Sequence, residues 1–109
     1  PFAYLVGVPA EEAKAFGSLV GTKVSINEFI AYADLSAMIK AGAISERTAK
    51  LAAFALCGFA NFSSIAIQIG GIGAMAPERR AEIAQLGIRA MIIGALTNLL
   101  TATIAGLLM

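Results

Sequence analysis

The stretch GFANFSSIAIQIGG (residues 58–71) lies inside an uncharged segment that covers residues 51–77. This segment is longer than the about 20 residues with which an α-helix crosses the apolar core of a bilayer. Near its middle, however, it carries Asn61 and Ser64, and these follow a glycine, a residue that weakens helices. The expected fold of this segment depends on the role of the hydrogen-bonding groups at its midpoint.

Two interpretations explain these polar groups. In the first, the helix is continuous and Asn61 and Ser64 bind it to a neighbour, because small and polar residues are enriched where membrane helices pack together. In the second, the helix is interrupted within residues 58–64, and its freed backbone groups and side chains face a solute, as in the broken helices of transporters. Periodicity alone leaves both alternatives open.

The composition indicates a membrane protein. Of the 109 residues, 59% are hydrophobic and 14% charged, and the mean hydropathy is +0.82, whereas soluble domains are about 25% charged. The net charge of +1 gives no reason to expect a nucleic-acid partner. There is no histidine, and we expect the one cysteine, Cys57, to be a packing residue. Histidine-based metal sites and Ser-His-Asp triads are therefore excluded within this chain, and we do not expect an enzyme.

The charged residues divide the chain. They leave residues 51–77 and 90–109 without charges, and we interpret both stretches as membrane-spanning helices. The expected segments are the end of a preceding helix (1–8), a hairpin (9–38), a broken transmembrane helix (47–76) and a last transmembrane helix (86–109). Because the chain starts at Pro1 in an apolar run, we expect it to be the C-terminal piece of a larger membrane protein.

The hairpin is predicted from two apolar runs that are each too short to span. The first run is broken at Gly21-Thr22-Lys23, and the second begins near Ser25 and continues to about Ile39. Apolar stretches of about 10–14 residues are more often re-entrant or interfacial than spanning. We therefore predict two short helices that enter the membrane and return, with a polar tip at residues 21–23.

Glu28 has two possible roles. Ser25-x-x-Glu28 has the pattern of a capping box, which opens the second helix of the hairpin. An ionisable residue at membrane depth is expensive, however, and a glutamine caps equally well, which favours a binding role for the carboxylate. Lys23, close by in the sequence, is a candidate to offset its charge.

Two motifs resemble a known family. GTKVSINEFIAY (residues 21–32) matches the signature G-x-K-x-x-x-N-E-F-V-A-Y of the concentrative nucleoside transporters, with Ile30 in place of valine. ALCGFANFSSIAIQIGGIGAMAPERR (residues 55–80) is similar to the stretch that precedes the last helix of these proteins. The resemblance covers almost the whole chain, which looks like the C-terminal part of a bacterial member.

The resemblance implies an all-α integral membrane fold and a transport function. Family members are symporters that take up nucleosides such as uridine with a Na⁺ or H⁺ gradient, and they form homotrimers in the plasma membrane, here the bacterial inner membrane. Their multi-pass transport core has two inverted repeats, each with a re-entrant hairpin and a partly unwound helix. This chain corresponds to one repeat. Its implied partners are the lipid bilayer and the N-terminal remainder of the protein, where the coupling-ion site is mainly expected.

The resemblance also implies the substrate-binding residues. The glutamate of the family's hairpin falls on Glu28, and its helix residues fall on Phe59, Asn61 and Ser64. Glu28, Asn61 and Ser64 are expected to hydrogen-bond to ribose, and Phe59 to line the site. The residue types suit this task, because vicinal hydroxyls donate well to a carboxylate while asparagine both donates and accepts. The alternative is a structural or regulatory membrane subunit without transport, which would not need an acid at the tip.

Overall fold

The computed structural model describes residues 1–109 and contains helices as its only regular elements. The six α-helices are α1 (Phe2–Val6), α2 (Ala13–Ser25), α3 (Glu28–Lys40), α4 (Glu46–Leu56), α5 (Phe62–Met75) and α6 (Arg80–Leu108). Short 3-10 turns, η1 (Ala10–Glu12) and η2 (Pro77–Arg79), precede α2 and α6. The expectation of an all-helical fold is therefore confirmed.

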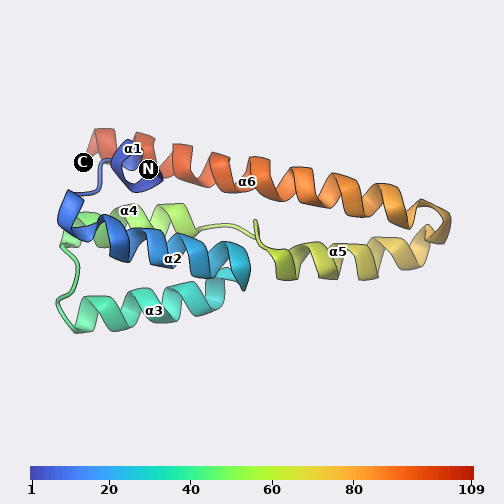
Figure 1. Cartoon of the computed structure of the whole chain (residues 1–109), viewed down its shortest axis with the longest axis horizontal. Coiled ribbons are helices and arrows are strands. Elements are labelled where there is room, and N and C mark those ends of the chain that lie inside the picture. Colours follow the sequence, from blue (N-terminus) through green and yellow to red (C-terminus); the bar gives the residue numbers. More distant parts are fainter.

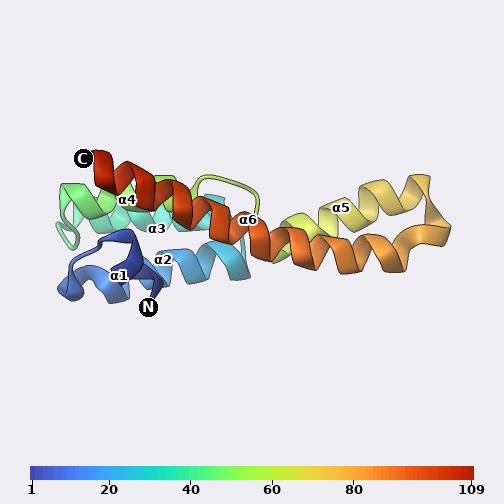
Figure 2. The same cartoon turned by 90° about the horizontal axis from the view of Figure 1, so that it is seen from above.

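The molecule is elongated, with extents of 49 × 25 × 20 Å. The long helix α6 runs along its whole length, while α4 and α5 lie end to end beside α6 (Figure 1). Helices α1, α2 and α3 accompany only the half that contains α4, and the view from above shows the same arrangement (Figure 2). The turn between α2 and α3 consequently lies halfway along the molecule, beside the junction of α4 and α5.

The predicted interruption of the uncharged segment is confirmed. Helix α4 ends at Leu56 and α5 begins at Phe62, so that residues 57–61 (the interruption) are not helical. Gly58 has a φ angle of 130°, which only glycine adopts without strain. The segment is thus two short helices. By length and composition, the only membrane-spanning candidate is Pro77–Leu108, which includes all of α6.

The predicted position of the hairpin tip is wrong. Helix α2 continues through Gly21, Thr22 and Lys23, and the chain turns at Ile26 and Asn27 (the hairpin tip). One glycine costs a helix only about 1 kcal/mol, and burial of this helix against its neighbours offsets that cost.

The capping box predicted at the hairpin tip is wrong as well. Ser25 is the last residue of α2. The residue that caps α3 is Asn27, whose Oδ1 accepts a hydrogen bond from the Ile30 amide at 3.0 Å. Glu28 is therefore the first residue of α3 and has no capping bond to make, so its carboxylate is free for other contacts.

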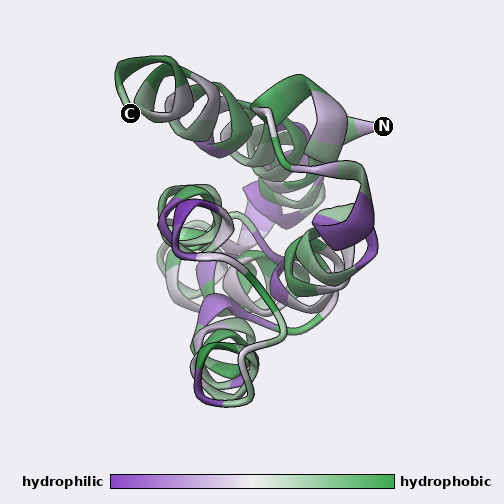
Figure 3. Ribbon diagram, turned by 90° about the vertical axis from the view of Figure 1, so that its left-hand side faces the viewer, coloured by the Kyte–Doolittle hydropathy of each residue, from purple (hydrophilic) through white to green (hydrophobic).

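The apolar core lies in the half that contains α4. It includes Phe16 and Leu19 of α2, Leu51 and Leu56 of α4, and Ala31 of α3, all of them buried. Helices of this half are seen nearly end-on in Figure 3, where hydrophobic stretches predominate and hydrophilic residues are spread over several helices, and both termini lie at this end of the molecule (Figure 1).

Two polar links fasten this end of the molecule. The carboxylate of Glu12 accepts hydrogen bonds from the Ser45 amide and hydroxyl, at 2.8 and 2.9 Å. Ser45 is in turn the N-cap of α4. Arg47 donates to the carbonyl oxygen of Gly106 at 2.9 Å, which ties the start of α4 to the end of α6.

We expect Gly58→Ala to lower the melting temperature of the full-length protein. A Cβ at this position would lie 3.0 Å from Nδ2 of Asn98 and would occupy a left-handed φ angle. Such a conformation costs about 1–3 kcal/mol for a residue other than glycine.

The control is Gly17→Ala in α2, where a Cβ meets nothing within 4 Å. This change removes a flexible residue from a helix, and we expect an unchanged or raised melting temperature. Equal melting temperatures for the two variants would contradict a conformational requirement for glycine at the interruption.

Candidate functional site

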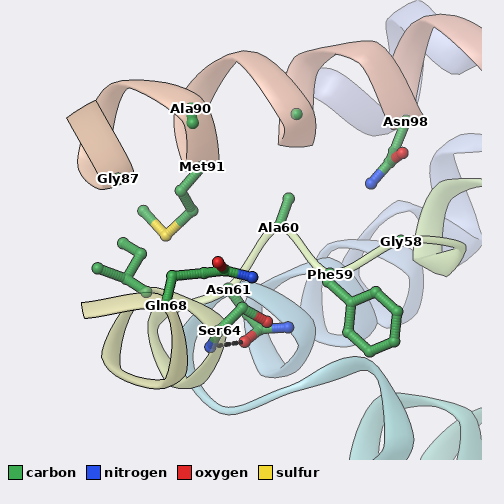
Figure 4. A pocket seen from close by; sticks show the side chains of 12 residues that line it. Gly58, Phe59, Ala60, Asn61, Ser64, Gln68, Gly87, Ala90, Met91 and Asn98 are labelled. Atoms are coloured by element: carbon green, nitrogen blue, oxygen red, sulfur yellow. Dashed lines mark hydrogen bonds between the residues drawn. The ribbon is translucent and has the colours of Figure 1, made fainter. Parts of the chain in front are cut away.

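A hollow of about 300 Å³ lies between the interruption, the start of α5 and the middle of α6. Figure 4 shows Met91 and Asn98 pointing from α6 toward α5 and the interruption. The hollow is lined by Gly58, Phe59, Ala60, Asn61, Ser64, Ile65, Gln68, Gly87, Ala90, Met91, Gly94 and Asn98. Small residues of α6 allow this approach, since a Cβ on Gly94 would lie 3.2 Å from that of Ala60.

Asn61 is the central polar side chain of the site, and it is only 1% exposed. Its Oδ1 accepts a hydrogen bond from the Ser64 amide at 2.8 Å, which caps the first turn of α5. Its Nδ2 donates to Oε2 of Glu28 at 2.6 Å. One amide side chain therefore joins the interruption to the hairpin tip, two segments that are far apart in the sequence.

The four residues predicted to bind substrate lie around one place. Phe59, Asn61 and Ser64 line the hollow, with the Phe59 side chain 79% exposed. Glu28 is not part of the lining, but it contacts Asn61 through the 2.6 Å hydrogen bond. The structure brings these side chains together, and their contacts with ribose stay a prediction.

Two further hairpin residues bind the other side of the interruption. Nζ of Lys23 donates to the carbonyl oxygen of Ala55 at 3.0 Å, and the Tyr32 hydroxyl donates to that of Ala53 at 2.8 Å. Both carbonyls belong to the last turn of α4, where helices have oxygens without a partner in the helix. Sequence reasoning did not assign this role, although both residues belong to the motif at positions 21–32.

Lys23 and Glu28, which were suggested to offset each other's charge, do not form a direct ion pair. The ion pairs of the chain are Lys50 with Glu46 and Arg79 with Glu82, all of them well exposed. The Lys23 ammonium instead faces the end of α4, and the Glu28 carboxylate faces Asn61. The two groups therefore have different hydrogen-bond partners, while Glu28 remains near enough to Lys23 for a favourable electrostatic interaction.

A third contact fixes the hairpin tip. The Ser63 hydroxyl donates to the carbonyl oxygen of Ile26 at 2.7 Å, so the first turn of α5 holds the hairpin turn directly. No role for Ser63 was predicted from the sequence. Asn98, Gln68 and Met91 of the lining were not predicted, because nothing local distinguishes them from packing residues of apolar helices.

The chemistry of the site suits a neutral ligand with hydroxyl groups. Oε1 of Glu28 accepts no hydrogen bond within the chain, whereas Asn61 is almost fully buried and both polar atoms of its amide group are engaged within the chain. No group of three or more His, Cys, Asp and Glu side chains comes together to hold a metal ion. The arrangement offers a carboxylate acceptor and an amide beside an aromatic ring.

We expect Asn61→Ala to destabilise the full-length protein more than Asn27→Ala. Each change removes the N-cap of one helix, which costs about 0.5–2 kcal/mol. Only Asn61→Ala also removes the hydrogen bond to Glu28, and bonds to charged groups contribute about 1.5–3 kcal/mol. Thermal unfolding would compare the two variants, and equal losses would show that the bond between Asn61 and Glu28 adds nothing.

Known proteins show which family this architecture belongs to. Residues 1–106 match the family model described as "Na+ dependent nucleoside transporter C-terminus". Over 97% of its length the chain is 49% identical to the putative nucleoside permease NupX of Escherichia coli K12, of which it covers 26%. Over 99% of its length it is 43% identical to the mouse sodium/nucleoside cotransporter 1, of which it covers 19%.

A solved structure agrees with this family. The chain superposes on CNTnw in an inward-facing substrate-bound state with a TM-score of 0.88 and 50% identity, over 96% of this chain and 26% of that one. It thus spans about a quarter or less of the length of these relatives, which are transporters and permeases rather than enzymes. The chain belongs to the Na⁺-dependent nucleoside transporter family, whose C-terminal part it matches.

Proposed function

We propose that the chain is the C-terminal part of a cation-coupled nucleoside symporter and supplies the ribose-binding half of its substrate site. Na⁺ is the favoured coupling ion over H⁺, because the matching family model and the mouse relative are both described as sodium-dependent. The coupling-ion site is proposed to lie mainly in the N-terminal remainder of the protein, as the family resemblance implies.

The observation that carries the proposal is the hydrogen bond between Asn61 and Glu28 at the interruption. It orients the carboxylate at the edge of a hollow and leaves Oε1 of Glu28 free. A free carboxylate oxygen is a strong acceptor for a ribose hydroxyl. Ser64 adds the hydroxyl group of its side chain to the lining. The exposed ring of Phe59 provides an apolar wall for the ligand.

The same geometry supports a proposal for the membrane arrangement. We propose that α6 spans the bilayer, that α4 and α5 form one broken span, and that α2 and α3 form a re-entrant hairpin. The hairpin tip at mid-length of α6 supports this, because a re-entrant hairpin must turn inside the membrane (Figure 1). The complete protein is proposed to be a multi-pass homotrimer of the bacterial plasma membrane, with two inverted repeats.

Uptake of labelled uridine by the full-length protein in sealed vesicles tests the proposal. We expect saturable uptake that accumulates uridine when a Na⁺ gradient is imposed and only equilibrates it without one. Uptake driven by a proton gradient alone would show that the coupling ion is H⁺ and not Na⁺. The absence of uptake under every gradient would favour the alternative of a structural or regulatory subunit.

We expect Glu28→Gln to weaken uridine binding about 10- to 150-fold. The change keeps the size of the side chain but removes a charged acceptor, and hydrogen bonds to charged groups contribute about 1.5–3 kcal/mol. The loss should be much smaller for the deoxynucleoside that lacks the contacted hydroxyl, because this analogue never forms the bond. Titration of uridine and its deoxy analogues into both proteins measures the difference.

The melting temperature separates binding from a structural role for Glu28. A glutamine at this position still accepts the hydrogen bond from Asn61, so we expect only a small change in melting temperature. An unchanged uridine affinity, together with a clearly lowered melting temperature, would mean that the carboxylate serves the fold and not the substrate.

Residues 1–109 expressed alone should show no saturable nucleoside uptake. The fragment contains one of two proposed repeats, and its polar groups facing the missing half would be left without partners in the bilayer, at several kcal/mol each. Uptake by vesicles containing the fragment, compared with those containing the full-length protein, checks this expectation. Activity of the fragment would show that the other half is dispensable.

A further inference from the structure

Lys23 is the only charged residue of the chain that is buried, with 1% of its surface exposed. It lies in the last turns of α2, close to the hairpin tip, and its Nζ donates to the carbonyl oxygen of Ala55 at 3.0 Å. A buried charge is costly unless it is compensated. The proposed substrate site does not use Lys23, so its burial requires a separate explanation.

The compensation for Lys23 comes from the end of a helix. Helix α4 ends at Leu56, and the backbone oxygens of its last turn carry the partial negative charge of the helix dipole. Phe54 uses its oxygen to accept from the Cys57 amide, and the oxygen of Ala55 is taken by Lys23. No carboxylate lies within ion-pair distance of this ammonium, so Glu28 contributes only a longer-range electrostatic interaction beside the direct contact with the helix end.

Backbone oxygens at the end of an interrupted helix bind ions in other membrane proteins. In broken transmembrane helices, the freed carbonyl oxygens and the C-terminal end of a half-helix coordinate small monovalent cations. An ammonium group carries the same charge and binds carbonyl oxygens through its N–H groups. At the end of α4, Lys23 therefore provides the kind of charge that a bound ion would provide.

We propose that the Lys23 ammonium is a built-in monovalent cation that occupies the C-terminal end of α4, so that this interruption is stabilised without an ion from solution. It is also a positioning residue for the substrate site. Lys23 fixes one side of the interruption to the hairpin, while Asn61 and Glu28 fix the other side. Loss of the first contact is expected to disturb the second.

Tyr32 makes a similar hydrogen bond to α4, and a comparison with it shows whether the end of α4 requires a positive charge or only a hydrogen-bond donor. Its hydroxyl holds the carbonyl oxygen of Ala53, also in the last turn of α4, but without a charge. If a donor were all that the end of α4 required, a second neutral side chain would serve there at a lower cost of burial. The presence of a buried ammonium beside a neutral donor indicates that the positive charge itself is needed.

The experiment uses the full-length protein with Lys23→Ala, Lys23→Met and the control Lys14→Ala, an exposed lysine of the same helix. Lys23→Ala deletes the outer methylenes and the ammonium group, which together have the shape of propylammonium. Melting temperature and uridine affinity are measured with propylammonium, with propanol (neutral, similar size) and with tetramethylammonium (charged, without N–H groups), at equal concentrations and ionic strength.

We expect Lys23→Ala to lower the melting temperature and to weaken uridine binding about 10-fold or more. Propylammonium should restore at least half of the lost melting temperature, whereas propanol and tetramethylammonium should not. Lys23→Met should be impaired without recovery, because its side chain fills the space. Lys14→Ala should behave as the unmodified protein does in all conditions.

Several results would overturn the proposal. Normal behaviour of Lys23→Met would show that only packing matters, and equal recovery with propanol would show that volume rather than charge is restored. Lack of recovery with any additive would contradict the built-in cation. A lowered melting temperature with normal uridine affinity would contradict the positioning role.

Two further arrangements keep the test decisive. If Lys23→Ala is not obtained as folded protein, it is expressed and purified with each additive, and the yield of monodisperse protein becomes the measurement. A higher yield with propylammonium alone supports the proposal, and equal yields contradict it. Only the affinity measurement rests on the proposed function: failure of the unmodified protein to bind uridine would refute that function, while the melting temperatures would still decide the role of Lys23.

Discussion

The structure depends on how the free backbone groups at the helix ends on either side of residues 57–61 obtain hydrogen bonds. An unpaired peptide group in apolar surroundings costs several kcal/mol, so a helix can stop there only if other groups supply the missing partners. The hairpin supplies them at the end of α4, and the interruption itself supplies them at the start of α5. Lys23 and Tyr32 donate to the carbonyl end of α4, and Asn61, held by Glu28, accepts from the amide end of α5.

This constraint explains why residues 21–32 form a dense motif. Lys23, Asn27, Glu28 and Tyr32 each make a hydrogen bond that determines where a helix begins or ends. Of these residues, Glu28 also contacts Asn61 in the lining of the hollow, so the motif is joined directly to the candidate site. A substitution in the motif is therefore expected to affect folding and binding together, and variants must be tested for both.

Much of the fold could be predicted from the sequence, and the failures have physical causes. The interruption was predictable because Gly58 and Asn61 act locally: glycine permits a left-handed φ angle, and asparagine caps a helix within its own first turn. The hairpin tip was misplaced because Gly21 is only a weak helix breaker, and packing of α2 overrides it. Asn27, a strong N-cap residue, was the better signal for the start of α3.

The residues of the candidate site could be predicted from the sequence, but the hydrogen bonds that hold them in place could not. Glu28, Phe59, Asn61 and Ser64 were identified through the resemblance to a family, and the structure brings them to one place. The contacts of Lys23 and Tyr32 with α4 join residues that are 32 and 21 positions apart in the sequence. Such contacts depend on tertiary packing, and no local pattern of residue types encodes them.

Helix α6 limits how the two parts of the broken helix can bend relative to each other. It is continuous from Arg80 to Leu108 and lies along both α4 and α5 (Figure 2). Near the interruption the backbones approach closely, with Ala60 against Gly94. A change of angle at residues 57–61 must therefore separate α6 from α4 or from α5, or carry all three helices as one rigid unit. Helix α6 therefore restricts bending at the interruption, although the interruption itself is not helical.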